Sequence, residues 1–164
     1  MKIAEAVHSI QESIDQIVEM SQGLSEDMIR WKPAEDKWAI IEVLCHVEEA
    51  TPYWLGELQQ LVKSPGAEWG RGLQHEGRLA AVAQADQRST KDVLQGIEST
   101  KGKVKEILSA MSEEVLKVES PSRNPRFGTK PMSFIVEHLL VEHLATHINQ
   151  IKRNIKQFEE ANKN

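Results

Sequence analysis

The sequence has little cysteine and no long apolar run. Its 164 residues include one cysteine, Cys45, so no disulfide can form within the chain, and a reducing, intracellular environment is expected. No stretch approaches the roughly 20 apolar residues that a membrane-spanning helix needs, and the first residues lack the apolar region of a signal peptide. We therefore expect a cytoplasmic protein without a membrane partner.

An excess of positive charge is absent too. Lysine and arginine number 20 against 25 aspartate and glutamate residues, which gives a net charge of −5. Proteins that bind nucleic acid usually carry a basic footprint, so no nucleic-acid partner is expected. Near the end of the chain, Lys152, Arg153 and Lys156 are typical of a solvated helix face near a C-terminal helix dipole.

What remains is the composition of an ordinary globular protein, with 40% hydrophobic and 27% charged residues. A chain of this length can bury about two thirds of the surface of its unfolded form. The simplest domain organisation is therefore a single domain over residues 1–164.

Apolar residues recur with helical spacing in four long segments, and no strand pattern competes. In the first segment the spacing alternates between four and three residues, at Ile3, Val7, Ile10, Ile14 and Ile17. The predicted helices span residues 2–22, 38–63, 89–112 and 131–160. Together they predict an all-α protein, a four-helix bundle.

The connections between these helices differ in length. Residues 64–88, between the second and third helices, form a long connection in which 78–85 favours a short helix, so we expect a partly ordered crossover or a lid. Residues 120–130 are predicted to be a loop. Within the second helix, Pro52 predicts a kink one turn beyond His46.

Two histidines lie where the apolar stripe of the last helix should hold leucines. At about 100° per residue, His143 and His147 fall roughly 20° on either side of Val136, near the middle of the stripe. An imidazole buried without a partner costs on the order of 1–3 kcal/mol. A metal ion would satisfy both rings, and histidines spaced i, i+4 on a helix can hold one. The alternative is a pair of histidines hydrogen-bonded to other core groups.

A third histidine, His46, lies on the second helix about 120° from Ile40, at the flank of the core face, from where it can lean toward the last helix. Imidazole ligands favour zinc, nickel or copper over magnesium or calcium. Three protein ligands leave one coordination position open, as in catalytic zinc sites. Side chains that could orient the imidazoles are Glu142, Glu49 and Gln150, although both glutamates could simply face solvent.

The remaining histidines and the cysteine are not predicted to bind the metal ion. His8 and His75 have no partner visible in the sequence, and His138 falls on the wet side of the last helix. Cys45 points about 100° away from His46, which indicates a small buried residue and not a ligand.

Several residues could contact a substrate. Trp69 lies in the glycine-rich crossover beside Arg71 and Arg78, and Arg126 lies in the later loop with Arg123. These arginines could meet an anionic substrate near the mouth of the bundle; ordinary surface charge is the alternative. Three other tryptophans are typical of core packing, namely Trp31, Trp38 and Trp54.

Two segments resemble a known family. Residues 31–33 (WKP) with 37–47 (KWAIIEVLCHV) resemble the second-helix motif of the DinB/YfiT-like metalloenzymes, the DinB superfamily, and residues 138–151 (HLLVEHLATHINQI) are similar to its last-helix motif. The resemblance implies a four-helix bundle with a long connection between helices 2 and 3. It also implies a divalent metal ion, usually zinc or nickel, held by His46, His143 and His147, the three residues that periodicity selects. The motif often has serine at the position of Ala39, a difference that concerns helix capping.

The resemblance also implies a function. The family includes S-transferases and isomerases that use low-molecular-weight thiols such as bacillithiol or mycothiol. We expect a metal-dependent thiol S-transferase that acts on a small-molecule substrate, with the thiol activated as thiolate at the three-histidine site. The alternatives are a metal-dependent hydrolase that uses a metal-bound water, and a non-catalytic metal-binding bundle with a role in stress responses. A homodimer through exposed helix faces is compatible with the sequence.

Overall fold

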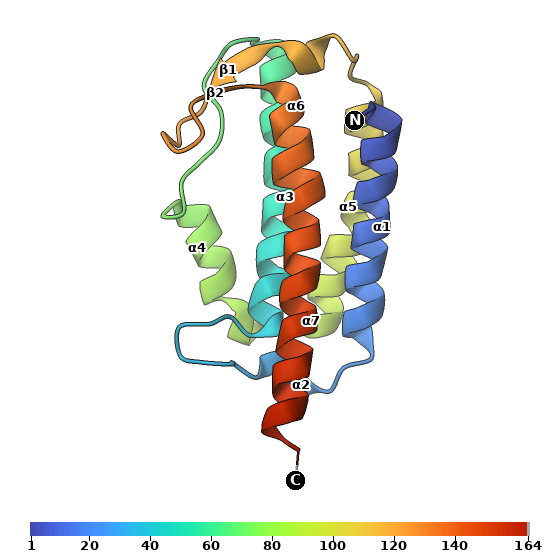
Figure 1. Cartoon of the computed structure of the whole chain (residues 1–164), viewed down its shortest axis with the longest axis vertical. Coiled ribbons are helices and arrows are strands. Elements are labelled where there is room, and N and C mark those ends of the chain that lie inside the picture. The colour runs from blue at the N-terminus through green and yellow to red at the C-terminus, as the bar shows by residue number, and fades with distance from the viewer. Residues whose placement is uncertain (164) are drawn as a thin grey trace.

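A computed structural model describes residues 1–163. Four long helices make up the bundle: α1 (Ile3–Gln22), α3 (Ile40–Lys63), α5 (Thr90–Ser109) and α7 (His143–Ala161). Figure 1 shows them running side by side, with the two ends of the chain at opposite ends of the bundle. The predicted all-α four-helix bundle is confirmed, and the predicted helix ends agree within a few residues.

The shorter elements lie in the connections and at the start of the last helix. They are α2 (Glu26–Arg30), α4 (Glu76–Ala83), η1 (Ala85–Gln87), η2 (Val115–Lys117), β1 (Glu119–Pro121), β2 (Thr129–Pro131), α6 (Met132–Phe134) and η3 (Ile135–Glu142). The short helix predicted in the crossover is therefore present as α4. Helix α3 continues through Pro52.

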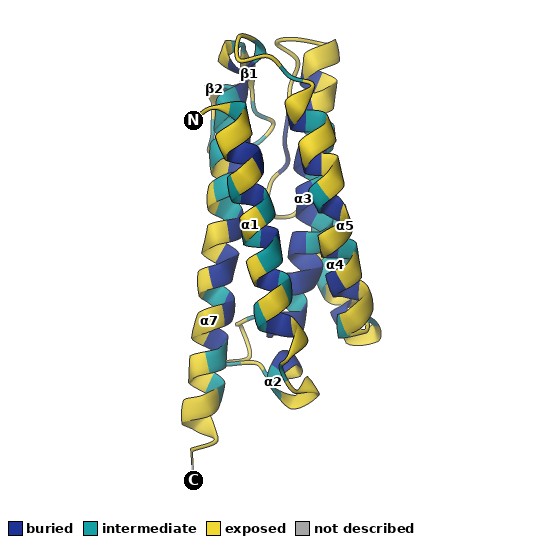
Figure 2. Cartoon of the chain, turned by 90° about the vertical axis from the view of Figure 1, so that its right-hand side faces the viewer, coloured by how far each residue is buried: buried dark blue, intermediate teal, exposed yellow. Residues whose placement is uncertain are grey.

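The core lies where the inner faces of the four long helices meet. Helix α1 packs along α5, and α3 packs against α5, α4 and α7. Figure 2 shows buried and exposed residues alternating along α1, α5 and α7, as amphipathic periodicity requires. Each fully buried aliphatic side chain contributes about 1.5–3 kcal/mol relative to an exposed one. Among the described residues, no helix is both long and apolar enough to cross a bilayer.

Residues 120–130, predicted to be a loop, instead contribute to a short hairpin at both ends. Strand β1 pairs antiparallel with β2, with Ser120 opposite Lys130. The crossover joins this hairpin, because the Trp69 amide donates to the Pro121 carbonyl at 3.1 Å and the Arg123 amide donates to the Trp69 carbonyl at 2.8 Å. Strands of three residues are too short to show the alternation by which a strand is recognised in a sequence.

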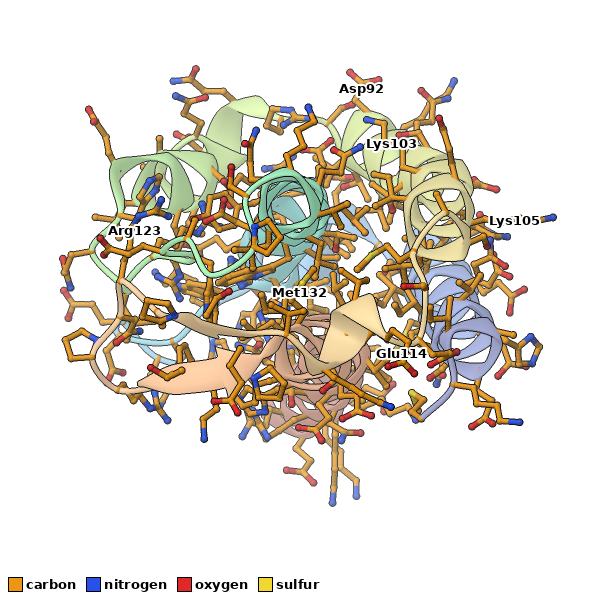
Figure 3. All side chains as sticks on the ribbon, turned by 90° about the horizontal axis from the view of Figure 1, so that it is seen from above. Asp92, Lys103, Lys105, Glu114, Arg123 and Met132 are labelled. Atoms are coloured by element: carbon orange, nitrogen blue, oxygen red, sulfur yellow. The ribbon has the colours of Figure 1, made fainter. Side chains whose placement is uncertain are left out.

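Ion pairs and hydrogen bonds also tie the crossover to α3. The Glu57 carboxylate accepts from the Gly70 amide at 2.7 Å, from the Tyr53 hydroxyl at 3.0 Å and from Arg123 at 3.1 Å. Seen from above in Figure 3, Arg123 lies on the outer side of the molecule, whereas Met132 lies toward the middle of the bundle. Through these contacts the crossover holds a fixed position beside α3.

The last helix is continuous but not uniform. Its first turn, α6, leads into η3, which is π-helical, and α7 follows. Backbone angles at Ile135 and His143 remain in the right-handed helical region, so the chain does not break at either junction. A π-helical segment has i→i+5 hydrogen bonds and is frequently found at functional sites. Here it ends at Glu142, directly before the first of the two histidines of α7.

Candidate metal centre

Three imidazole rings from two helices converge on one point. The Nε2 atom of His143 lies 3.1 Å from Nε2 of His46 and 2.9 Å from Nε2 of His147. One ligand atom from each ring lies within 4.8 Å of the others. His46 and His143 are 97 residues apart in sequence. The structure therefore brings together the three histidines that the sequence predicted to be ligands.

Helix α3 buries His46 more deeply than its expected position at the flank of the core. The residue is 4% exposed, and the Trp38 ring lies 5.2 Å from its imidazole, centroid to centroid. The helix begins after Ala39, whose amide donates to the Glu42 carboxylate at 2.9 Å. That bond fixes the first turn of α3, two turns before His46.

The proton count of the cluster shows whether a cation fits it. His147 donates from Nδ1 to the Gln150 carbonyl oxygen at 2.8 Å, so its Nε2 carries a lone pair. Nε2 of His143 carries either one proton or one lone pair, yet it lies beside both Nε2 of His46 and Nε2 of His147. It can therefore form only one of these two hydrogen bonds, whereas a cation accepts the lone pairs of all three nitrogens. Two nitrogen ligands of a tetrahedral zinc lie about 3.3 Å apart, close to the spacings here.

Burial keeps these imidazoles neutral. Desolvation, followed by the neighbouring imidazoles, lowers the pKa of His46 to about 2. Desolvation and His147 lower the pKa of His143 to about 3. The pKa of His147 is also lowered by desolvation, against an opposing effect of the bond to Gln150. A metal-binding imidazole must be deprotonated, so all three rings are in the protonation state that ligation requires at neutral pH.

Three side chains were expected to orient the imidazoles, and only Gln150 is hydrogen-bonded to an imidazole of the cluster. Its carbonyl oxygen accepts from His147, which fixes the tautomer of that ring. The Glu142 carboxylate contacts Nδ1 of His138 at 2.8 Å. The Glu49 carboxylate forms a bidentate ion pair with Arg71, whose side chain is 4% exposed. Neither glutamate is hydrogen-bonded to a ring of the cluster.

A cavity of about 200 Å³ opens beside His46 and His143. Three of the four expected substrate-binding residues line it: Arg71, Arg78 and Arg126. Arg71 is already paired with Glu49, whereas Arg78 donates to the Leu73 carbonyl at 3.1 Å and lies over the Trp38 ring. The pKa of Arg78 is lowered by burial and by the positive charge of Arg71, so an anion in this cavity would relieve repulsion between the two guanidinium groups.

Trp69, the fourth expected substrate-binding residue, does not line the cavity. Its ring is 1% exposed, packs against Trp54 and Phe127, and donates from Nε1 to the Ser120 carbonyl at 2.8 Å. The indole is therefore part of the core between the crossover and the hairpin, because an apolar ring with one satisfied donor is stable there.

Two histidines have roles that sequence reasoning missed, and the cysteine has the expected one. His138 is partly solvated as predicted, yet it also lines the cavity and stacks on Phe134. His75 caps α4, because its Nδ1 accepts from the Gly77 amide. Histidine is not among the usual N-cap residues, so the sequence offered no signal for that cap. Cys45 is buried, and desolvation raises the pKa of its thiol to about 11, so it remains a thiol.

Comparison with known proteins places the chain in context. Residues 9–151 match the family model of the DinB superfamily. Among solved structures, YfiT from Bacillus subtilis is similar, with a TM-score of 0.83 at 9% sequence identity, over 96% of this chain and 87% of that one. YfiT is described as a probable metal-dependent hydrolase with an unusual four-helix bundle topology. No curated protein matches the sequence.

Proposed function

The chain belongs to the DinB superfamily, and on that premise we propose that it is an enzyme whose divalent metal ion is held by His46, His143 and His147. The observation that carries the proposal is the convergence of three neutral Nε2 atoms at spacings of 2.9 and 3.1 Å. An all-imidazole donor set favours zinc or nickel over magnesium or calcium. When bound, such an ion lowers the pKa of a thiol or water that coordinates it.

For the reaction we favour thiol S-transfer with a low-molecular-weight thiol such as bacillithiol. The support is the positive charge of the cavity, where Arg78 and Arg126 form no ion pair in the described structure and are available to bind an acidic small molecule. Trp54 and Phe127 line the same cavity and exclude water from one side. In this reaction the thiolate sulfur attacks the electrophile, a sulfur–carbon bond forms, and the leaving group departs with its electron pair.

The second candidate is a hydrolase that uses the same three histidines to activate water. The description of YfiT as a probable metal-dependent hydrolase favours it, together with the similarity of the two folds. The two candidates share ligands and cavity but differ in whether a thiol is consumed.

Thiol dependence separates them. The protein is purified, its metal content is measured, and turnover of 1-chloro-2,4-dinitrobenzene is followed with and without bacillithiol, beside hydrolysis of 4-nitrophenyl acetate without thiol. Release of chloride only with thiol supports the transferase, and ester hydrolysis without thiol supports the hydrolase. His147→Ala should abolish the activity while retaining helicity. The control is His8→Ala, which replaces an exposed histidine and should retain both activity and helicity. A metal-loaded protein inactive in both assays would favour a non-catalytic metal-binding bundle.

A further inference from the structure

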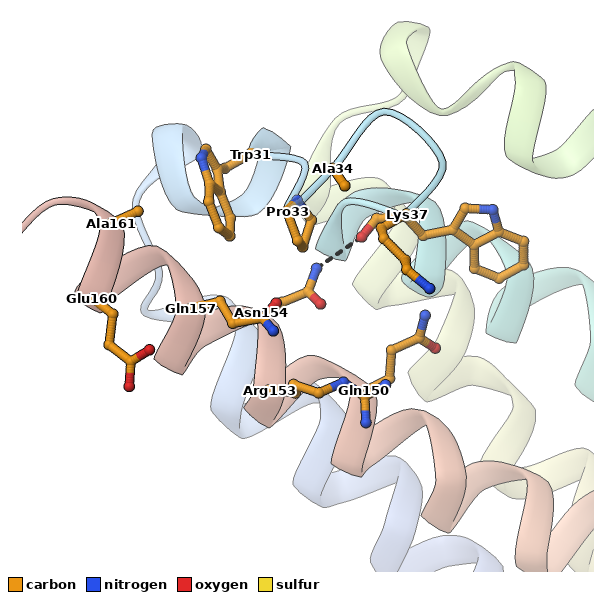
Figure 4. A pocket seen from close by; sticks show the side chains of 11 residues that line it. Trp31, Pro33, Ala34, Lys37, Gln150, Arg153, Asn154, Gln157, Glu160 and Ala161 are labelled. Atoms are coloured by element: carbon orange, nitrogen blue, oxygen red, sulfur yellow. Dashed lines mark hydrogen bonds between the residues drawn. The ribbon is translucent and has the colours of Figure 1, made fainter.

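A second and larger cavity, of about 620 Å³, lies between α7 and the segment 31–39. We refer to it as the α7 groove, and Figure 4 shows the side chains that line it. Its volume is in the range of small-molecule sites, roughly 300–1,000 Å³. It shares no lining residue with the cavity at the metal centre, although two of its residues, Trp38 and Gln150, contact His46 and His147.

Two cationic side chains without counter-ions and one carboxylate, that of Glu160, line the α7 groove. In the described part of the chain, neither Lys37 nor Arg153 forms an ion pair. They come from different elements, Lys37 from the segment before α3 and Arg153 from α7. Glu160 lies at the opposite end of the groove from Lys37 in Figure 4, so the end near Lys37 is the positive one. In a chain with a net charge of −5, two unpaired cations at that end favour an anionic ligand there.

Gln150 adds a neutral donor to the same place. Its carbonyl oxygen is engaged by His147, so the amide NH₂ is the end available to the groove. In Figure 4 the ends of Gln150 and Lys37 turn toward one another. Lys37 and Arg153 are exposed and Gln150 is half-buried, so water satisfies these donors in the free protein. A carboxylate can replace that water, because its two oxygens can accept from Lys37, from the Gln150 amide and from the guanidinium of Arg153.

The groove is held in shape before any ligand arrives. Asn154 is 4% exposed, and its amide donates to the Trp38 carbonyl at 2.8 Å, which ties the segment 31–39 to α7. Trp31 and Pro33 form an apolar wall, and the Trp31 ring packs edge-on against Phe158 at 5.6 Å between centroids. A preformed site loses less free energy on binding than one that must be ordered.

We propose that the α7 groove binds a small organic carboxylate. Lys37, Arg153 and the Gln150 amide hold the carboxylate, and its apolar body packs against Trp31 and Pro33. The site is separate from the proposed catalytic cavity and does not depend on the reaction proposed for it.

The test is a calorimetric titration of the purified protein with benzoate, and with benzamide as the uncharged counterpart of the same shape. Benzoate should bind with a dissociation constant on the order of 1 mM, as expected for a ligand of this size, and benzamide should bind at least several-fold more weakly. Lys37→Met and Arg153→Met should each weaken benzoate binding by about three- to tenfold.

Two matched variants locate the binding. Lys156→Met removes one exposed charge from α7 outside the groove, and Arg126→Met removes one charge from the cavity at the metal centre. Both should leave benzoate binding unchanged. Loss of binding in Arg126→Met would place benzoate at the metal centre and overturn the proposal. Equal binding of benzoate and benzamide, absence of binding, or full binding in Lys37→Met and Arg153→Met would overturn it too.

Discussion

The Nδ1 atom of His147 donates to the carbonyl oxygen of Gln150 at 2.8 Å, and this bond fixes which ring nitrogen faces the other two imidazoles. Partners of this kind orient a metal ligand and raise its basicity. One glutamine, a single turn beyond the ligand pair, thus fixes the orientation of one of the three donors.

Replacement of Gln150 with leucine should lower the affinity for zinc by about 10- to 100-fold, because the imidazole of His147 loses its hydrogen-bond acceptor and is free to change tautomer. The affinity is measured by competition with a chromophoric chelator. Gln157→Leu makes the same change two turns further along α7, at an exposed position, and should leave the affinity unchanged. Equal affinities in Gln150→Leu and the parent protein would refute the role of the bond.

The metal-free protein should lose stability as the pH falls from 7 to 5. The pKa values of His46 and His143 in the folded state, about 2 and about 3, lie below the value of 6.5 in the unfolded chain. Below pH 6.5 the unfolded state takes up protons that the folded state does not, so each histidine destabilises the fold by up to about 1.4 kcal/mol per pH unit. Urea unfolding at a series of pH values, with a chelator present, measures the slope.

The variant that tests the assignment of this slope is His143→Gln, which removes one of the titrating groups. Its unfolding free energy should depend less steeply on pH than that of the parent. A parent protein equally stable at pH 7 and pH 5 would show that the rings are not buried in the neutral form.

Ala39→Ser should stabilise the protein by about 0.5–1 kcal/mol. Ala39 has the extended backbone of a helix N-cap, and Glu42 already accepts from its amide, so only the reciprocal bond is missing. A serine hydroxyl can accept from the Glu42 amide and complete the pair. Thermal unfolding measures the gain. Ala34→Ser, in the loop before α3, should give no gain, and a lower melting temperature for Ala39→Ser would contradict the prediction.

Breaking the ion pair between Glu49 and Arg71 should cost about 3–5 kcal/mol, because Glu49→Gln leaves the guanidinium of Arg71 charged, unpaired and only 4% exposed. Chemical unfolding provides the measurement. The comparison is Glu114→Gln, which breaks an exposed pair with Lys117 and should cost less than about 1 kcal/mol. Similar losses in the two variants would mean that burial does not strengthen the inner pair.

The sequence predicted the long helices and the three ligands because both depend on local spacing. His143 and His147 interrupt a regular apolar stripe, so their inward direction follows from helical period alone. For His46 the same reasoning placed the ring at a flank, whereas it is buried. Near its start, α3 is buried on nearly all sides, from Ile40 to Val47, so no single core face can be identified there.

Other features depend on contacts between distant residues, which no spacing encodes. Glu49 meets Arg71 across 22 residues, and Trp69 meets the hairpin across about 50. The first contact pairs Arg71 with a carboxylate, and the second buries Trp69, although both residues were predicted to contact a substrate. The sequence could name candidates in the crossover, but the pairing partners decided which ones remained available.

The backbone bridge between Trp69 and the hairpin determines how the mouth of the metal centre can deform. A free flap would swing open at little cost. Here two backbone hydrogen bonds at Trp69 join the crossover, which contributes Arg71 to the lining of the cavity, to the hairpin segment, which contributes Asn124. Widening would require both segments to lift as a unit, with loss of the buried indole packing. The entrance of the cavity would therefore resist widening, and it would exclude bulky molecules by size before they reach the three histidines.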